Sequence, residues 1–569
     1  MRLNRAYVAA TALALVMGAD LSAQVRPTRA QPRVNPNPRL LVATPHVFTP
    51  TDSAAAVRVG NGMRNRLVGQ ADRWFNVITR EHMNEALELY AYPPDAVLPP
   101  MVARTLGTAL QARMLVSSTM TRDPSGRYTI ASRLIGMNDE AGHLVINVQQ
   151  PAQSFEEFGV ATANAMLPAF RALPDAKACF EQMATNQDRA VNEALKALRT
   201  LPDHGLASFC LGEIALAREN DAEAITRFES ATKGDSGSLA AWTKLAMLYH
   251  RGGDSARVVS TYQQMLRVAP TNQLLREDAF RIFLAYGKPD AALEVAEEGL
   301  AIDPGNAELW DLKSNACLYL ENYPCAIDAL EQVFSNDSTK ADTTFFQKIT
   351  FVASREPDTV RFLRWSRAGV RKYPDNPILL EQLIQAYGYA GPVDSVVAVT
   401  RRLVAIDNSD MTPVVRAVQA LGNAGRNREM MELGAFIVQH GNNDDKQNYA
   451  GLLTTAIQPL VQQDPRDWPL IADMSRAALA HVPEGTQLWA PLNYFLGLAA
   501  FFQMAPLDAE ADAQKSCEIA QRMQALLDEA GPALTAGRSA ANEQYVSQLL
   551  STVEQARPRV AQHIRNFCR

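Results

Sequence analysis

The 569-residue sequence predicts a mostly α-helical protein: an α-solenoid of stacked helical hairpins, preceded by a small α+β domain with a mixed sheet. Past about residue 186, amphipathic helical patterns recur with a period of 34 residues and no strand pattern follows. Alanine and leucine are plentiful, and aromatic residues make up only 7%, which favours helices. Each repeat packs on its neighbours, so such an array lengthens without enlarging one core.

Residues 1–23 have the pattern of a secretory signal peptide. Arg2 and Arg5 precede an apolar run over residues 6–19, and Ala23 offers a small residue for cleavage. The apolar run is shorter than the roughly 20 residues that a bilayer span needs. We therefore expect a periplasmic or otherwise exported protein. Retention of the same segment as an N-terminal membrane anchor is the alternative.

The rest of the chain is mildly acidic. The net charge is −6 for the full sequence and becomes −7 when Arg2, Arg5 and Asp20 are removed with the signal peptide. Basic runs are absent, so nucleic acid is not expected as a partner. No later stretch has 18 unbroken apolar residues, and we expect no integral membrane segment after cleavage. Association with the envelope remains open.

The six cysteines are expected to form three disulfides between neighbours in the chain. An even number of cysteines in an exported chain permits such bonds. The predicted pairs are Cys179 with Cys210, Cys317 with Cys325, and Cys517 with Cys568. A closed loop of about 30 residues contributes about 3–4 kcal/mol in the loop-entropy model. Buried free thiols are the alternative at each pair.

Residues 24–39 contain four prolines and no apolar periodicity, which is typical of an extended linker. An α+β unit follows over residues 40–175. Its strands are expected over residues 40–44, 74–79, 113–122, 127–137 and 143–149. A helix is expected to follow an N-cap within Thr51-Asp52-Ser53 and to run through Gln70, and others from about Arg80, over 102–110, and from about 155 to 173. One face of the fourth strand carries Tyr128, Ile130, Ser132 and Leu134.

This order of elements resembles the TolB N-terminal-like domain. The run Arg104-Thr105-Leu106-Gly107 enters the three-stranded meander, and Asp139 and Gly142 turn it. The resemblance covers about 130 residues of the sequence. In bacteria this domain is often joined to tetratricopeptide repeats. The TolB N-terminal-like family has no catalytic motif that could be assigned to residues of this sequence.

Residues 176–444 carry the repeats. Units 205–238, 239–272, 273–306 and 307–340 follow one another, with small residues where helices would cross and large ones between them. The residues that fit this repeating pattern of small and large side chains include Leu211-Gly212, Ala224, Phe228, Trp242, Tyr249, Ala279, Ala292, Trp310 and Ala326. A two-residue insertion then shifts the register to a unit beginning near Thr343. The pattern resembles the tetratricopeptide repeat (TPR). Residues 445–569 are expected to form degenerate helical repeats and a C-terminal cap.

Catalytic signatures are missing from the sequence. There is no Gly-rich phosphate loop, no GxSxG and no HExxH. CxxC motifs and Cys/His clusters are absent too, so neither a metal site nor a cofactor is expected. His82 beside Glu81 and Glu85 would suit a metal ion, but we interpret these residues as a solvated helix face. The sequence predicts that the protein is not an enzyme.

The resemblance to TPR proteins implies a concave groove lined by the first helix of each repeat. Outward positions on these helices are Phe209, Glu213, Thr243, Met247, His250, Glu277, Arg281, Leu284, Asp311, Asn315, Tyr319, Glu381, Gln385 and Tyr389. Aromatic anchors among amides and carboxylates would hold a protein or peptide partner. Thr243, Glu277 and Asp311 stand where peptide-clamping relatives have lysine, so capture of a C-terminal carboxylate is not predicted. The acidic residues favour a partner with basic character.

The leading hypothesis is therefore a non-catalytic periplasmic scaffold or adaptor that binds a protein or peptide on the repeats. One alternative makes the α+β domain a small-ligand or glycan sensor, on the ground of its mixed sheet and polar turns. A second alternative is an enzyme whose site is assembled from residues distant in sequence.

Overall fold

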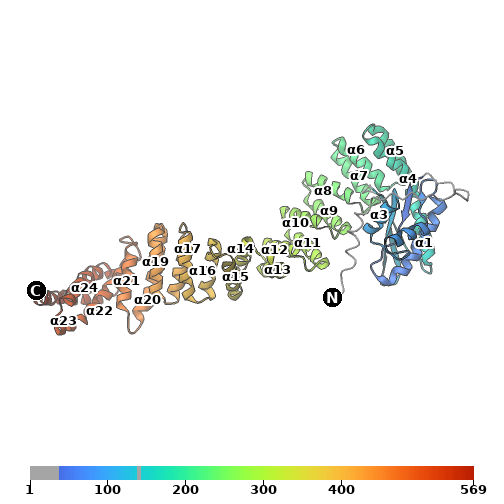
Figure 1. Cartoon of the computed structure of the whole chain (residues 1–569). Coiled ribbons are helices and arrows are strands. Elements are labelled where there is room, and N and C mark those ends of the chain that lie inside the picture. Colours follow the sequence, from blue (N-terminus) through green and yellow to red (C-terminus); the bar gives the residue numbers. More distant parts are fainter. Residues whose placement is uncertain (1–36, 138–141, 569) are drawn as a thin grey trace, which may run out of the picture. The chain divides into compact units, whose positions relative to one another are not determined.

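The computed structural model describes residues 37–137 and 142–568 (Figure 1). These residues divide into two compact units, the first of which ends at Pro270. Unit 1 contains the sheet and the first repeats, and unit 2 contains the remaining helices. The predicted signal peptide, most of the linker and part of the turn before Gly142 lie outside the described residues.

Unit 1 begins with a five-stranded mixed sheet in the order β2-β1-β3-β4-β5. The strands are β1 (Arg39–Val42), β2 (Asn76–Val77), β3 (Met114–Arg122), β4 (Tyr128–Gly136) and β5 (Gly142–Val148). β1 runs parallel to β2 and β3, whereas β3, β4 and β5 form an antiparallel meander. The expected mixed sheet is confirmed, with a shorter second strand than predicted.

Helices cover both faces of this sheet. They are α1 (Ser53–Gln70), α2 (Arg80–Leu89), α3 (Pro100–Ala109) and α4 (Phe155–Met183). Successive side chains of a strand point to opposite faces. Leu40 and Val42 therefore pack with the apolar side chains of α1 and α4, whereas Leu41 packs with those of α2 and α3. α4 is longer than predicted and continues past residue 175. The domain boundary expected at residue 175 stays a prediction.

The repeats of unit 1 follow the predicted period. Their helices are α5 (Gln187–Thr200), α6 (Gly205–Ala217), α7 (Asp221–Gly234), α8 (Leu239–Arg251) and α9 (Ser255–Val268). His204 caps α6 and Ser238 caps α8, each by accepting a hydrogen bond from a backbone N–H of the first turn. Small residues let paired helices approach: a Cβ at Gly212 would lie 2.6 Å from the ring of Phe228.

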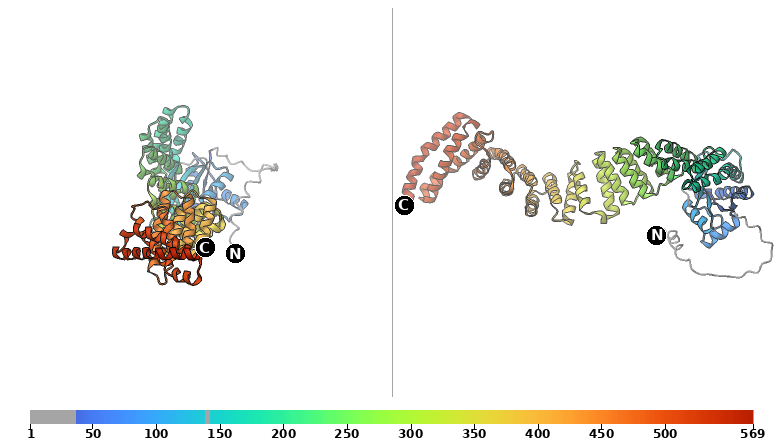
Figure 2. Two further views of the ribbon diagram at one scale, coloured as in Figure 1. Left: turned by 90° about the vertical axis from the view of Figure 1, so that its left-hand side faces the viewer. Right: turned by 90° about the horizontal axis from the view of Figure 1, so that it is seen from above.

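Unit 2 continues with helical hairpins, in which successive helices pack on one another, as the right-hand view of Figure 2 shows. Its helices are α10 (Gln273–Ala285), α11 (Pro289–Ile302), α12 (Ala307–Tyr319), α13 (Tyr323–Asn336), α14 (Thr343–Ala353), α15 (Thr359–Lys372), α16 (Pro377–Ala390), α17 (Val393–Ile406), α18 (Thr412–Asn423), α19 (Asn427–His440), α20 (Asn443–Gln462), α21 (Trp468–Leu479), α22 (Trp489–Met504), α23 (Leu507–Gln514), α24 (Cys517–Ala536) and α25 (Glu543–Phe567). The 3₁₀ turn Ser338–Lys340 precedes α14 and accommodates the two-residue insertion. The predicted TPR-type α-solenoid is confirmed.

All three predicted disulfides are present. Cys179–Cys210 joins α4 to α6, Cys317–Cys325 joins α12 to α13, and Cys517–Cys568 joins α24 to the end of α25. Disulfides persist mainly in oxidising compartments, so the bonds indicate an exported protein. Among the helices that the structure describes, none combines the length and the apolar character that a membrane span requires.

Candidate functional site

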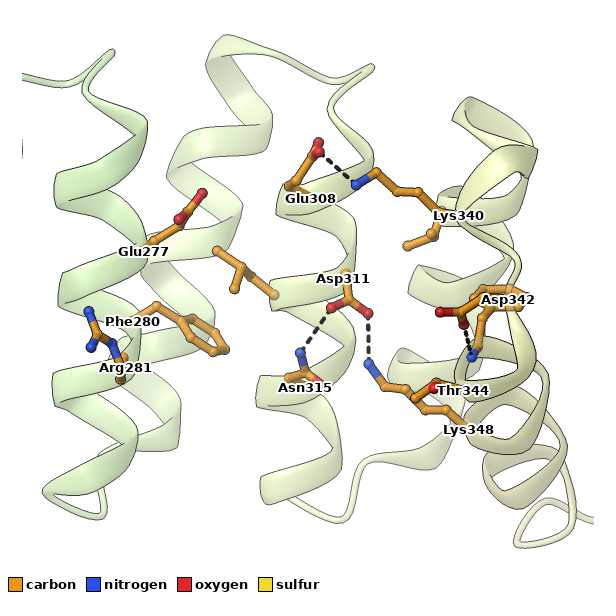
Figure 3. A pocket seen from close by; sticks show the side chains of 13 residues that line it. Glu277, Phe280, Arg281, Glu308, Asp311, Asn315, Lys340, Asp342, Thr344 and Lys348 are labelled. Atoms are coloured by element: carbon orange, nitrogen blue, oxygen red, sulfur yellow. Dashed lines mark hydrogen bonds and ion pairs between the residues drawn. The ribbon is translucent and has the colours of Figure 1, made fainter. Parts of the chain in front are cut away.

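A pocket of about 770 Å³ opens between the first helices of three repeats in unit 2 (Figure 3). We call the surface formed by α10, α12, α14, α16 and α18 the first-helix face. Four of the predicted groove residues line this pocket: Glu277, Arg281, Asp311 and Asn315. The 34-residue period places Glu277 and Asp311 at equivalent positions of successive helices. The structure thus brings together residues that the sequence places in different repeats.

The floor of the pocket is apolar. Phe280 from α10 and Phe345 from α14 are buried, as is Val333 from α13, and Leu312 from α12 is half-buried. Figure 3 shows the ring of Phe280 pointing into the space between the helices. Apolar walls with a few polar groups are typical of binding sites, and this floor can receive an aliphatic or aromatic side chain.

Two lysines on the rim are already engaged by carboxylates. Lys340 Nζ lies 2.7 Å from Glu308, and the hydrogen bond from Lys340 is the main reason that the pKa of Glu308 is lowered. Lys348 Nζ donates to Asp311 at 2.8 Å and to the hydroxyl of Ser314 at 2.7 Å. Both ammonium groups are therefore already held in ion pairs within the protein.

The remaining charge of the pocket is negative. Four carboxylates and three cations line it, and the third cation, Arg281, pairs with Asp278 just outside. Glu277 accepts only an amide hydrogen bond from Gln273, at 3.1 Å. Asp342 caps α14 by accepting the backbone N–H of Phe345 at 2.8 Å. Glu277 and Asp342 face no cation at ion-pair distance among the described residues, so the rim suits a basic group.

A second pocket of about 460 Å³ lies between α16 and α18. The predicted residues Gln385 and Tyr389 line it together with Arg416, Gln419 and Asn423. Side-chain amides both donate and accept hydrogen bonds, as a peptide backbone requires, and the exposed ring of Tyr389 offers an aromatic surface. These groups can hold an extended main chain.

Glu381 lies one turn before Gln385 on α16. Burial raises the pKa of Glu381, and the nearby carboxylates of Asp410 and Asp407 raise it further, while Arg416 lowers it. This part of the first-helix face is therefore also rich in negative charge.

Other predicted residues lie elsewhere. Phe209 is half-buried against the core of unit 1, and its ring packs on Phe180 and Phe228, with centroids 6.2 and 5.3 Å away. Glu213 forms an ion pair with Lys244 at 2.9 Å. Thr243, Met247 and His250 are exposed on α8, Tyr319 is exposed at the end of α12, and Leu284 is half-buried on α10.

Several residues of the pocket escaped sequence analysis. Phe345 and Lys348 follow the two-residue insertion, where a fixed 34-residue step no longer points to the correct positions, and Lys340 lies in the turn just before it. The starts of α12 and α14 are 36 residues apart. A step of 36 residues from Asp311 ends next to Lys348, so this spacing would have pointed to Lys348. Phe280 was missed because it lies between two outward positions on α10.

In the described residues, no three His, Cys, Asp or Glu side chains are grouped as metal ligands. His82, which the sequence places near Glu81 and Glu85, shares a hydrogen bond of 3.2 Å with the hydroxyl of Thr79. Thr79 caps α2, so the contact belongs to the helix terminus.

Comparison with known proteins finds matches among solved structures. No protein-family profile and no curated protein sequence matches the chain. The structure of Naa15/Naa10 bound to HypK-THB aligns with 68% of this chain and 66% of that chain, at 13% identity and a TM-score of 0.38. YrrB, described as a TPR protein with an unusual peptide-binding site, aligns with 31% of this chain and 91% of its own, at 12% identity and a TM-score of 0.28.

The C-terminal part of a TPR repeat-containing protein from Cytophaga hutchinsonii gives a similar result. It aligns with 43% of this chain and 96% of its own, at 11% identity and a TM-score of 0.28. The fold itself, stacked TPR-type helical hairpins, follows from the helices of the structure.

Proposed function

We propose that this protein is a non-catalytic scaffold or adaptor of the periplasm, or of another exported compartment, that binds an extended segment of a protein partner on its first-helix face. The observation that carries the proposal is the pocket between α10, α12 and α14. It combines an apolar floor with an acidic rim on the surface where helices of successive repeats meet.

The chemistry of the pocket defines the segment. An apolar side chain would enter between Phe280 and Phe345, where its burial contributes about 1.5–3 kcal/mol. A neighbouring lysine or arginine would approach Glu277, which lacks a cationic partner among the described residues. The amides of the second pocket would bind main-chain groups. The partner is therefore expected to present apolar and basic residues in an extended stretch.

Two observations support an exported location. The first 23 residues have the composition of a secretory signal, and the three disulfides suit an oxidising compartment.

The test is affinity purification of the full chain from its native envelope after crosslinking, followed by mass spectrometry. Two variants address the pocket: Thr344→Trp places a large side chain at its exposed edge, and Glu277→Lys reverses its free charge. Glu294→Lys is the matched control, since Glu294 is exposed on the second helix α11 and lies outside the pocket.

We expect to recover one stoichiometric partner with the wild-type protein. Either pocket variant should lower this recovery at least about tenfold, which corresponds to a loss of about 1.4 kcal/mol of binding free energy. The control should recover the partner like the wild type. Absence of a stoichiometric partner, or recovery unaffected by both pocket variants, would refute the proposal.

A further inference from the structure

A polar pocket of about 550 Å³ lies in the α+β domain, at the carboxyl ends of two parallel strands. β2 ends at Val77, and Thr79 and Arg80 at the start of α2 line the pocket. Arg64 of α1 also lines it and donates to the carbonyl of Val42, the last residue of β1, at 3.0 Å. Ligands of open α/β sheets bind outside the carboxyl ends of the strands, especially where helices leave to opposite faces, as α1 and α2 do here.

Arg64 is a buried cation without a carboxylate at ion-pair distance among the described residues. It is 1% exposed, and burial lowers its pKa to about 10. One guanidinium nitrogen donates to Asn61 at 2.6 Å, but the Nε–H is buried without an acceptor. Two carboxylates act on Arg64 beyond ion-pair distance: Asp95, which Arg80 engages at 2.9 Å, and Glu81. Because buried charges are normally paired, we expect an anion to bind next to this guanidinium.

The rest of the lining complements Arg64. Arg58, Asn61 and Asn65 share one face of α1, at helical spacings of three and four residues. Arg58 is exposed and forms no ion pair with a described residue. Two asparagines, Thr79 and the exposed carboxylate of Glu81 supply hydrogen-bond donors and acceptors that suit hydroxyl groups. The pocket thus offers a cationic end and a polar middle, with two exposed carboxylates, Glu81 and Glu156, in its lining.

We infer that this pocket binds a sugar-sized, polyhydroxylated ligand that carries a carboxylate or a phosphate. The oxyanion lies against Arg58 and Arg64, and the hydroxyl groups face Asn61, Asn65 and Glu81. The volume falls within the range of small-molecule sites, roughly 300–1,000 Å³, and exceeds what a lone phosphate fills. The site is separate from the first-helix face and does not depend on the proposed scaffold function.

Calorimetric titration of the full chain tests the inference with four probes: glucose 6-phosphate, glucuronate, glucose and inorganic phosphate. We expect glucose 6-phosphate or glucuronate to bind, and the better of the two identifies the oxyanion. Glucose and inorganic phosphate should bind at least about tenfold more weakly. The inference is overturned if neither anionic sugar binds at millimolar concentration, or if glucose or inorganic phosphate binds as tightly as both.

Variants locate the binding. Arg58→Ala changes an exposed side chain. It should lower the affinity for the tighter-binding anionic sugar at least about tenfold, as loss of a charge-assisted contact does. Arg64→Lys keeps a cation but loses the planar donor fork, and should also lower this affinity. Arg171→Ala, exposed on α4 and outside the lining, is the matched control and should leave affinity unchanged. Unchanged binding by Arg58→Ala, whose fold is checked by circular dichroism, overturns the assignment.

Discussion

Lys348 on α14 reaches back to Asp311 on α12, with its Nζ 2.8 Å from the carboxylate, and so joins two successive repeats beneath the acidic rim of the pocket. The ammonium is the more desolvated partner: its side chain is 19% exposed, against 46% for Asp311. The pair also removes Asp311 from the carboxylates available to a partner. The acidity that a ligand meets therefore comes from Glu277 and Asp342 rather than from Asp311.

Replacing Lys348 tests this link between repeats. Lys348→Met should lower the stability of unit 2 by about 1 kcal/mol, because Asp311 loses its ion pair at a partly exposed site. The change appears as a lower urea midpoint followed by circular dichroism. Lys348→Arg keeps a cation within reach and should retain most of the wild-type midpoint. If the methionine and arginine variants unfold together at the wild-type midpoint, the pair does not stabilise the repeats.

A second ion pair fixes the sheet to the repeats of unit 1. Arg133 Nε on β4 lies 2.8 Å from Asp235, which follows α7 and whose side chain is 1% exposed. Asp235 also accepts the backbone N–H of Gly142 at 2.8 Å. Arg133→Met would leave a buried carboxylate without its cation, which costs about 3–5 kcal/mol. Hydrogen exchange should report faster opening of β4 and β5.

The control for this prediction is Arg127→Met. Arg127 and its partner Asp123 are largely exposed at a turn, and the change should shift stability by less than about 1 kcal/mol. The double variant Arg133→Met/Asp235→Asn removes the buried charge and should recover part of the loss. Equal destabilisation by Arg133→Met and Arg127→Met would show that burial of Asp235 is unimportant.

The sequence predicted the repeat helices well because their periodicity is set by local chemistry. The helix starts at Gly205, Leu239, Gln273 and Ala307 are each 34 residues apart, and polar caps such as Ser238 and Asn272 mark them. Small residues at the crossings follow the same spacing. The length of α4 was not predicted, since it depends on packing against α5 and α6, which the local pattern does not encode.

The candidate site was predicted only in part for a related reason. Outward residues such as Glu277 and Asp311 follow from the period, and the structure places them in one pocket. Whether a side chain is free depends on its neighbours in space: Asp311 is paired with Lys348, and Phe209 is enclosed by two other rings. Neither contact is visible from helical spacing. The pocket of the α+β domain was missed because strands, helix termini and α1 meet there only in three dimensions.

Gly212 lies at a close approach of α6 and α7. Gly212→Ala would place a Cβ about 2.6 Å from the ring of Phe228, which is buried and cannot move aside freely. We expect a loss of about 1–3 kcal/mol, as for other overpacked cores. The urea midpoint of the full chain measures it. Gly252→Ala is the control, because its Cβ would meet its nearest atom at 3.4 Å, an ordinary contact. Similar midpoints for both variants would show that the crossing tolerates a methyl group.

Acid should destabilise unit 1 through a buried pair of histidines. His204 caps α6 and stacks on His143 of β5 with ring centroids 5.4 Å apart, and it is 0% exposed. Burial, and then the neighbouring His143, lower the pKa of His204 to about 3. Burial also lowers the pKa of His143, although Asp203 and Asp235 oppose the shift.

The folded pKa of His204 is below the value of about 6.5 in an unfolded chain, so the unfolded state binds the proton more tightly. The stability that the neutral ring contributes is fully present above pH 6.5 and is lost as the pH falls towards 3. Between pH 7 and pH 5 the loss amounts to about 2 kcal/mol from this group.

The variant His204→Asn separates this titration from that of other groups. Asparagine keeps a side-chain acceptor for the N–H of Ala207, which His204 Nδ1 accepts at 3.3 Å, but does not titrate. Urea midpoints at about pH 7 and pH 5 should therefore differ less in the variant than in the wild type, whatever the variant's absolute stability. His250→Asn, at an exposed position of α8, should keep the wild-type difference. If the pH dependence of His204→Asn equals that of the wild type, protonation of the buried ring does not drive the acid sensitivity.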